Sequence, residues 1–146
     1  MTSDVLQVEI IERLSWPYRQ NAQELINSIR DPEAFPCAQF RLDDDDAVGV
    51  EFFADLRTVS EPAHGLFEYN GKFAVDFNIG FAPTASAEGL KTTFLEGQLW
   101  TPALAIILSQ ASRRSILNYG RQHLRPEISV VRIPNKNMFI RNFYGN

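Results

Sequence analysis

Alternation of apolar and polar side chains predicts a sheet in the first half of the chain, because successive residues of a strand point to opposite faces. The alternation runs over residues 4–15, 48–60 and 72–83, and Phe40 and Leu42 open a shorter candidate strand. A slip of one residue in 48–60 would exchange its apolar and charged faces, so the pattern specifies the register of that strand.

Two local signals connect these strands. Asn70-Gly71 lies between two alternating runs, and this dipeptide predicts a tight hairpin, since a type I′ turn needs positive φ at both central residues. Earlier in the chain, apolar residues at helical spacing predict a short amphipathic helix that ends at Asp31-Pro32: Ala22, Leu25, Ile26 and Ile29.

The second half of the chain predicts a long helix over residues 101–124. Thr101 suits the cap and Pro102 the first helical position, where no amide hydrogen is needed. The first turns are apolar all round, which is typical of a helix buried on both flanks. A copy of the same helix in a partner subunit is therefore expected to cover the second flank, through Leu104, Ile107, Leu108 and Ala111.

The order of these elements predicts an α+β fold, with an antiparallel four-stranded β-sheet followed by a long C-terminal helix. A further short extended piece is expected around Ile128 and Val130, closed by Pro134. No repeat or linker divides the chain, and 146 residues match the size of one domain, so residues 1–146 are expected to form a single unit.

Composition narrows the class of protein. Hydrophobic residues make up 45% of the chain, enough for a packed core, yet no window approaches the ~18 consecutive apolar residues of a membrane span. Residues 1–14 carry Asp4, Glu9 and Glu12 where a signal peptide would have an apolar run. The single cysteine, Cys37, excludes an intramolecular disulfide and favours a reducing, cytoplasmic location.

Charge is divided unevenly along the chain. Of the 18 acidic residues only Glu127 lies in residues 97–146, which also hold seven bases. This asymmetry is compatible with a nucleic-acid or acidic-ligand surface, in which Tyr119 would stack beside Arg113, Arg114, Arg121 and Arg125. The sequence pI of about 5.2 favours the alternative, that the two halves complement each other within the fold or an oligomer, so nucleic acid is not the expected partner.

No motif for catalysis or cofactor binding is found. Asp43–Asp46 is the one carboxylate cluster, but four adjacent aspartates cannot all face one ion, and a solvated turn at a sheet edge is the preferred interpretation. His64 and His123 are isolated from any metal-ligand pattern. No enzyme activity, metal or cofactor is therefore expected, and a metal-dependent enzyme built on Asp43–Asp46 and His64 is the least favoured hypothesis.

The aromatic residues point to a binding surface. The chain has 11 Phe, 4 Tyr and 2 Trp, more than a small core ordinarily needs. Exposed apolar patches generally mark binding sites. Five aromatic residues fall in predicted loops, at strand ends or on a charged strand face, and are candidates for binding polypeptide: Trp16, Tyr18, Phe35, Phe40 and Phe53. The alternative is that residues 16–40 fold back over the core.

Residues 107–116, followed by 124–134, resemble the C-terminal part of SecB, the protein-export chaperone. In both, a long helix with an Arg in mid-course precedes a Pro and a short apolar stretch, and the runs at 48–60 and 72–83 resemble that family's long strands. The likeness covers about residues 48–134. It implies an ATP-independent chaperone, assembled as a homo-oligomer (a dimer or a tetramer), that binds unfolded polypeptides in aromatic-lined grooves.

One difference from SecB concerns its motor. The SecB family docks SecA through an acidic patch near the end of the first strand, whereas this chain has Arg13 in that region. This speaks against binding of a SecA-type motor. The resemblance then favours a SecB-like chaperone for export or antitoxin clients.

Overall fold

A computed structural model describes residues 18–30, 36–97, 99, 102–109, 111–119 and 124–142. The predicted strand over residues 4–15 lies outside these ranges. The described chain forms, in order, α1 (Tyr18–Ser28), β1 (Cys37–Phe40), β2 (Ala47–Val48), α2 (Phe52–Ser60), α3 (His64–Asn70), β3 (Lys72–Ser86), β4 (Gly89–Glu96), β5 (Leu104–Leu108), a 3-10 turn η1 (Ile116–Asn118), α4 (Leu124–Glu127) and β6 (Ser129–Ile140).

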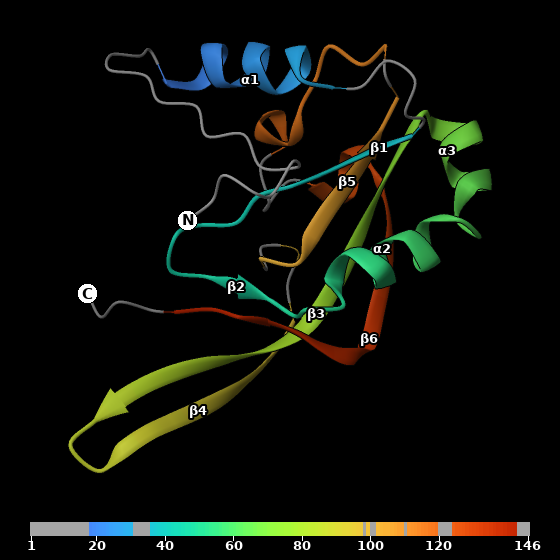
Figure 1. Cartoon of the computed structure of the whole chain (residues 1–146). Coiled ribbons are helices and arrows are strands. Elements are labelled where there is room, and N and C mark those ends of the chain that lie inside the picture. Colours follow the sequence, from blue (N-terminus) through green and yellow to red (C-terminus); the bar gives the residue numbers. More distant parts are fainter. Residues whose placement is uncertain are drawn as a thin grey trace.

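All six described strands belong to one mixed sheet, arranged around β3 (Figure 1). The strand order is β1-β5-β3-β6-β2, and β4 pairs with the far half of β3. Only the pairing of β3 with β6 is parallel; the others are antiparallel. The predicted four-stranded antiparallel sheet with a long C-terminal helix is therefore wrong.

The structure differs most from the prediction over residues 101–124, where a long helix was expected. The apolar run forms β5, whose five residues are all buried, and no long helix follows it in the described part of the chain. A strand covered on both faces is apolar at every position, so hydrophobic periodicity cannot separate it from a buried helix. Both faces of β5 are covered by the chain itself, because Ala105 and Ile107 belong to one core cluster and Leu104, Ile106 and Leu108 to the other.

Residues 48–60 were also predicted as a strand, and they form β2 and α2 instead. Phe52 and Leu56 are buried, which suits both periods, since residues four apart share a side in a strand and in a helix. Val50 decides between them: it is fully exposed, although a strand would bury it beside Phe52. Val59 and Ala63 also pack against the core, and their spacing from Leu56, three and seven residues, is that of one helix face.

Asn70-Gly71 ends a helix rather than joining two strands. Gly71 has φ of 65° and caps α3, with its N–H donating to the carbonyl oxygen of Phe67 at 2.6 Å. Gly71 therefore has the positive φ that the sequence predicts, but it uses this conformation to cap a helix and not to form a hairpin turn. The hairpin of this region lies further along, where Ser86 pairs with Gly89 between β3 and β4, and β3 continues through Pro83.

Two predicted elements are present: the short helix is α1, and the strand over 72–83 is contained in β3. The strand expected to open at Phe40 and Leu42 is not formed, because β1 ends at Phe40 and leaves Leu42 outside it. The extended piece expected around Ile128 is longer than predicted, because β6 continues through Pro134 to Ile140.

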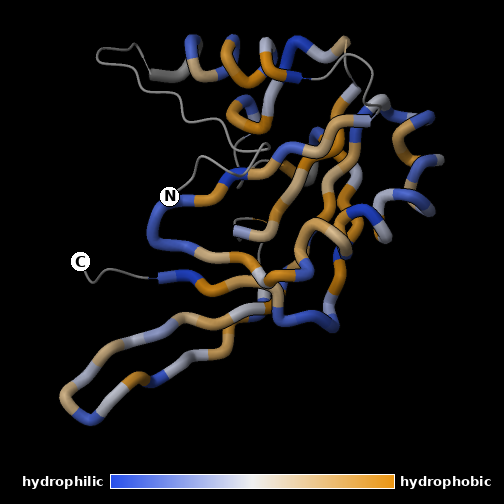
Figure 2. Tube along the Cα trace, in the orientation of Figure 1, coloured by the Kyte–Doolittle hydropathy of each residue, from blue (hydrophilic) through white to orange (hydrophobic). Residues whose placement is uncertain are grey.

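The core has two layers, one on each face of the sheet. On one face α2 and α3 pack against Phe73, Val75 and Phe77 of β3. On the other face, residues from η1, α4 and their neighbours pack with Ala74 of β3 and with Leu104, Ile106 and Leu108 of β5: Ile116, Tyr119, Leu124 and Ile128. Figure 2 shows apolar residues along the crossing strands β3, β5 and β6, and a hydrophilic stretch after β1. None of the described helices has the length and hydropathy needed to cross a membrane.

Candidate functional site

The Asp43–Asp46 run forms a turn directly after β1. The N–H of Asp46 donates to the carbonyl oxygen of Asp43 at 3.1 Å, which closes the turn. Nε of Arg41 lies 3.3 Å from Oδ1 of Asp43. The run is therefore a defined turn at the end of a sheet strand.

Asp46 has the most perturbed electrostatics in this turn. Partial burial raises the pKa of its carboxyl above the ordinary 3.8, and the nearby Arg141 lowers it. The carboxylates of Asp45 and Asp43 raise the pKa again, while a backbone hydrogen bond from Asn142 lowers it. Burial is the largest of these effects, and the net shift of the Asp46 pKa is upward. A carboxylate with a raised pKa is a stronger proton acceptor.

The turn does not assemble a metal site in the described residues. Among them, no group of three or more His, Cys, Asp or Glu side chains could hold a metal ion. His64 does not supplement the aspartates: its Nε2 lies 3.8 Å from Oε1 of Glu68, and its ring stacks on Phe67.

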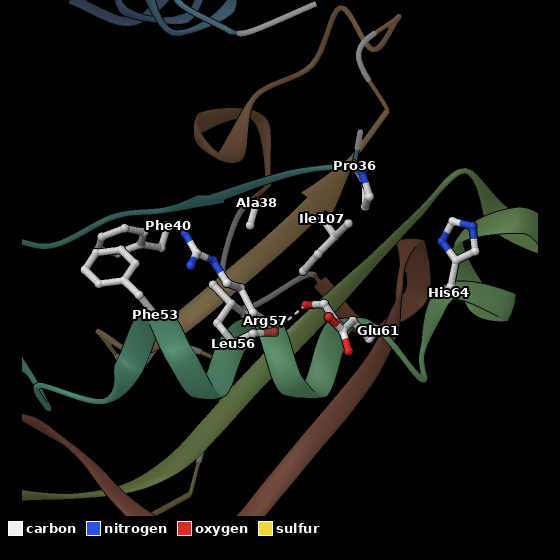
Figure 3. A pocket seen from close by; sticks show the side chains of 10 residues that line it. Pro36, Ala38, Phe40, Phe53, Leu56, Arg57, Glu61, His64 and Ile107 are labelled. Atoms are coloured by element: carbon white, nitrogen blue, oxygen red, sulfur yellow. Dashed lines mark hydrogen bonds between the residues drawn. The ribbon is translucent and has the colours of Figure 1, made fainter. Parts of the chain in front are cut away.

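A groove of about 590 Å³ begins at the same end of β1 as the turn. One wall is the face of β1 that carries Pro36, Ala38 and Phe40, with Ile107 of β5 behind it. The other wall is a stripe of α2 that continues to the start of α3: Phe53, Leu56, Arg57, Ser60, Glu61 and His64. Figure 3 shows Phe40 and Phe53 together at one end of the groove and His64 at the other.

The aromatic end of the groove is rigidly packed and partly open. The rings of Phe40 and Phe53 meet edge to face with centroids 5.5 Å apart, and Phe52 contacts both from the core. Phe52 is fully buried, whereas Phe53 is 56% exposed. The groove therefore presents an aromatic surface fixed from behind.

Two opposite charges lie in the middle of the groove. Arg57 lies on α2, Glu61 caps the C-terminus of that helix four residues later, and in Figure 3 the Arg57 guanidinium points toward β1. Neither side chain forms an ion pair or a side-chain hydrogen bond with another described residue. Ser60 is engaged locally, since its hydroxyl donates to the carbonyl oxygen of Leu56 at 2.6 Å.

The structure brings two of the five aromatic candidates together, Phe40 and Phe53. Trp16 and Phe35 lie outside the described residues, and Tyr18 is described only as the first residue of α1. The sequence reasoning missed Arg57 and Glu61. They lie four and eight residues after Phe53, a spacing that would place all three on one side of a helix, but the pattern of residues 48–60 predicts a strand.

The four residues predicted at an oligomer interface are placed differently. Leu104, Ile107 and Leu108 are buried in β5 by the chain's own elements, and Ala111 is exposed in the loop after it. The apolar circumference that motivated the interface is thus hidden within one chain.

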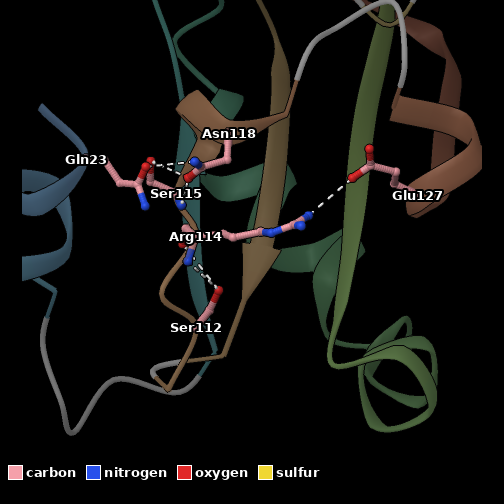
Figure 4. A network of polar contacts seen from close by, with 6 residues as sticks. All are labelled: Gln23, Ser112, Arg114, Ser115, Asn118 and Glu127. Carbon is pink, nitrogen blue, oxygen red and sulfur yellow. Dashed lines mark hydrogen bonds and ion pairs between the residues drawn. The ribbon is translucent and has the colours of Figure 1, made fainter. Parts of the chain in front are cut away.

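Arg114, one of the basic residues of the C-terminal third, takes part in a local polar network (Figure 4). A side-chain nitrogen of Arg114 donates to Oε2 of Glu127 at 3.2 Å, and its guanidinium lies 5.7 Å from the ring of Tyr119. Lys72 covers the same ring at 5.2 Å, and Tyr119 is only 7% exposed. Tyr119 therefore does not offer a free face for stacking on a base, as the nucleic-acid hypothesis requires.

Helix α1 and Arg30, which follows it, are hydrogen-bonded to the loop that carries Arg113 and Arg114. The guanidinium of Arg30 donates to the carbonyl oxygens of Ser109, Ser112 and Arg114 at 2.9–3.1 Å. Gln23 and Asn27 of α1 both donate to the carbonyl oxygen of Arg113, and Asn118 donates to Gln23 at 2.7 Å. These bonds satisfy loop carbonyls and give α1 a structural role.

Comparison with known proteins gives one match. The model of the family described as "Putative rhamnosyl transferase" matches residues 1–146, while no curated protein and no solved structure matches the chain. This finding overturns the resemblance to SecB and the terms chaperone and protein transport that came with it. It also overturns the expectation that the chain is not an enzyme, because the family is named for group transfer. The chain belongs to this rhamnosyl transferase family.

Proposed function

We propose that the protein catalyses glycosyl transfer, moving a rhamnosyl group from an activated donor to a hydroxyl group of an acceptor. The observation that carries this proposal is the family match over the whole chain. The carboxylate turn and the amphipathic groove, adjacent at the end of β1, support it as places for proton transfer and substrate binding.

The proposed reaction is a substitution at the anomeric carbon of the donor. The acceptor oxygen forms a bond to that carbon, the bond from the carbon to the leaving-group oxygen breaks, and the leaving group departs with the electron pair. The acceptor hydroxyl loses its proton to a base. Asp46 is our candidate for this base, because a raised pKa increases the proton affinity of its carboxylate.

Donor cleavage tests the proposal. The full chain is incubated with a nucleoside-diphosphate rhamnose, with and without a set of methyl glycosides as acceptors, and release of the nucleotide is measured. We expect release that the acceptors accelerate, and a loss of about 100-fold or more in Asp46→Asn. Glu88→Gln, an exposed carboxyl on the β3–β4 hairpin, is the control. Absence of release from the wild-type protein under all conditions would contradict the proposal.

Other functions predicted from the sequence stay predictions. Polypeptide binding is measurable as suppression of client aggregation without nucleotide, and nucleic-acid binding as a mobility shift at low salt. Self-association also stays a prediction, although the helix that suggested it is not formed. The cytoplasmic location inferred from the single cysteine is part of the present proposal.

A further inference from the structure

We infer that the groove between β1 and α2 binds a neutral pyranoside, as the acceptor of the transfer. This inference rests on the proposed function. Its size is compatible with such a ligand, because about 590 Å³ lies within the range of ~300–1,000 Å³ typical of small-molecule sites.

The aromatic end of the groove suits one face of a sugar ring. A pyranose presents apolar C–H groups on its faces and hydroxyl groups around its edge, so it is bound by an exposed ring on one side and polar groups around it. Phe53 is more than half exposed and is held by edge-to-face contacts with Phe40 and Phe52. Its ring therefore offers a fixed apolar platform at low entropic cost.

The charged middle of the groove favours a neutral, polyhydroxylated ligand. Arg57 supplies only donors and ionised Glu61 only acceptors, so together they serve hydroxyl groups, which both donate and accept. A single anion or cation would meet one attractive and one repulsive charge here. Since neither side chain is engaged by another described side chain, both are available to a ligand.

The position of the groove is consistent with an acceptor. Phe40 ends β1 and lines the groove, and Asp43 begins the carboxylate turn three residues later. Three residues span at most ~10 Å of extended chain, and the 3.1 Å hydrogen bond from the Asp46 N–H to the Asp43 carbonyl oxygen folds the candidate base, Asp46, back toward the start of the turn. A sugar on Phe53 would place its outer hydroxyl groups in this region.

Saturation-transfer NMR on the full chain, without any donor, tests the inference. The probes are the methyl pyranosides of glucose, galactose, mannose, N-acetylglucosamine and rhamnose. We expect at least one to bind, and Phe53→Ala and Arg57→Gln each to weaken its binding by about fivefold or more. Phe94→Ala is the matched control, because Phe94 is 54% exposed and contacts Phe81 edge to face, but lies on the β3–β4 hairpin. Thermal melts confirm that each variant is folded.

Three results would overturn the inference: no methyl pyranoside binds, binding is equal in wild type and both groove variants, or Phe53→Ala changes the oligomeric state, which would assign the groove to a second copy of the chain. Failure here is distinct from failure of the proposed function. Donor cleavage that persists in Phe53→Ala and Arg57→Gln, with no pyranoside binding, would remove the acceptor groove and leave the transferase in place.

Discussion

The fully buried carboxylate of Asp76 in β3 accepts a hydrogen bond of 3.2 Å from Nε of Arg132 in β6. The two residues are direct partners in the parallel ladder that joins these strands. A buried charge costs free energy unless it is paired, so this contact ties the central strand to the last one.

Removal of the cation from this pair is expected to destabilise the fold. Arg132→Met should lower the free energy of unfolding by about 3 kcal/mol, because it leaves the Asp76 charge buried without this partner. Asp76→Asn is the milder change, since it removes the charge and keeps the shape. Urea unfolding measures both. A loss in Arg132→Met no larger than that of Asp76→Asn would show that the pair does not act in this way.

Gly80 lies where β3 closely approaches Phe139 of β6. A Cβ atom at Gly80 would clash with the carbonyl oxygen and the ring of Phe139, next to a register shift in the ladder. Gly80→Ala should therefore cost about 1–3 kcal/mol through overpacking. Gly65→Ala is the control, because nothing lies within 4 Å of its Cβ position and Ala is the better helix former in α3. The midpoint temperature of thermal unfolding should fall in Gly80→Ala and rise in Gly65→Ala.

The cap of α3 gives a third prediction. Gly71 has φ of 65°, which costs an L-residue with a Cβ atom about 1–2 kcal/mol. Gly71→Ala is expected to lose this amount, and Gly71→Asn distinctly less, since Asn tolerates the left-handed region. Equal chemical stability of the Ala variant and the wild type would contradict the assigned cap.

The pH dependence of stability should report on Asp46. Its carboxyl has a raised pKa in the folded state, so the folded protein binds the proton more tightly than the unfolded chain does. Stability contributed by this group falls as pH rises through the interval from the ordinary 3.8 to the raised pKa, and is lowest above it. Asp46→Asn should therefore be more stable than wild type at pH 7. The difference in stability between Asp46→Asn and wild type should vanish below pH 3.8, the ordinary pKa of the carboxyl. Urea unfolding midpoints of both proteins, measured as a function of pH, test this.

The sequence predicts local elements better than their assembly. The helix at α1 and the alternating strand at β3 follow from periods that neighbouring residues define. By contrast, Phe53, Arg57 and Glu61 are spaced by four, a spacing that a strand and a helix share, so only the exposure of Val50 in the fold settles the assignment. The run from Leu104 to Leu108 is apolar at each position, and burial on both faces leaves no period to detect.

The sequence predicts the aromatic residues of the candidate site but not its charged residues. Phe40 and Phe53 were identified as aromatic residues without a place in the core, and they meet in the groove. The sequence predicts a solvated turn for Asp43–Asp46, because four adjacent aspartates cannot all face one ion. That argument addresses metal binding and carries no signal for proton transfer by one carboxylate. The polar half of the groove depends on α2 being a helix, whereas the alternating pattern of residues 48–60 predicts a strand.

The parallel pairing of β6 sets an order of events during synthesis. β3 finds its last neighbour only after the chain has passed through β4, β5 and α4, and β2 pairs with that same final strand. Contacts of such long sequence separation form late and slowly. While β6 is still inside the ribosome, a nascent chain would therefore expose one edge of β3, its longest described strand. Chaperones or proteases that recognise unpaired strand edges would bind the protein at that stage.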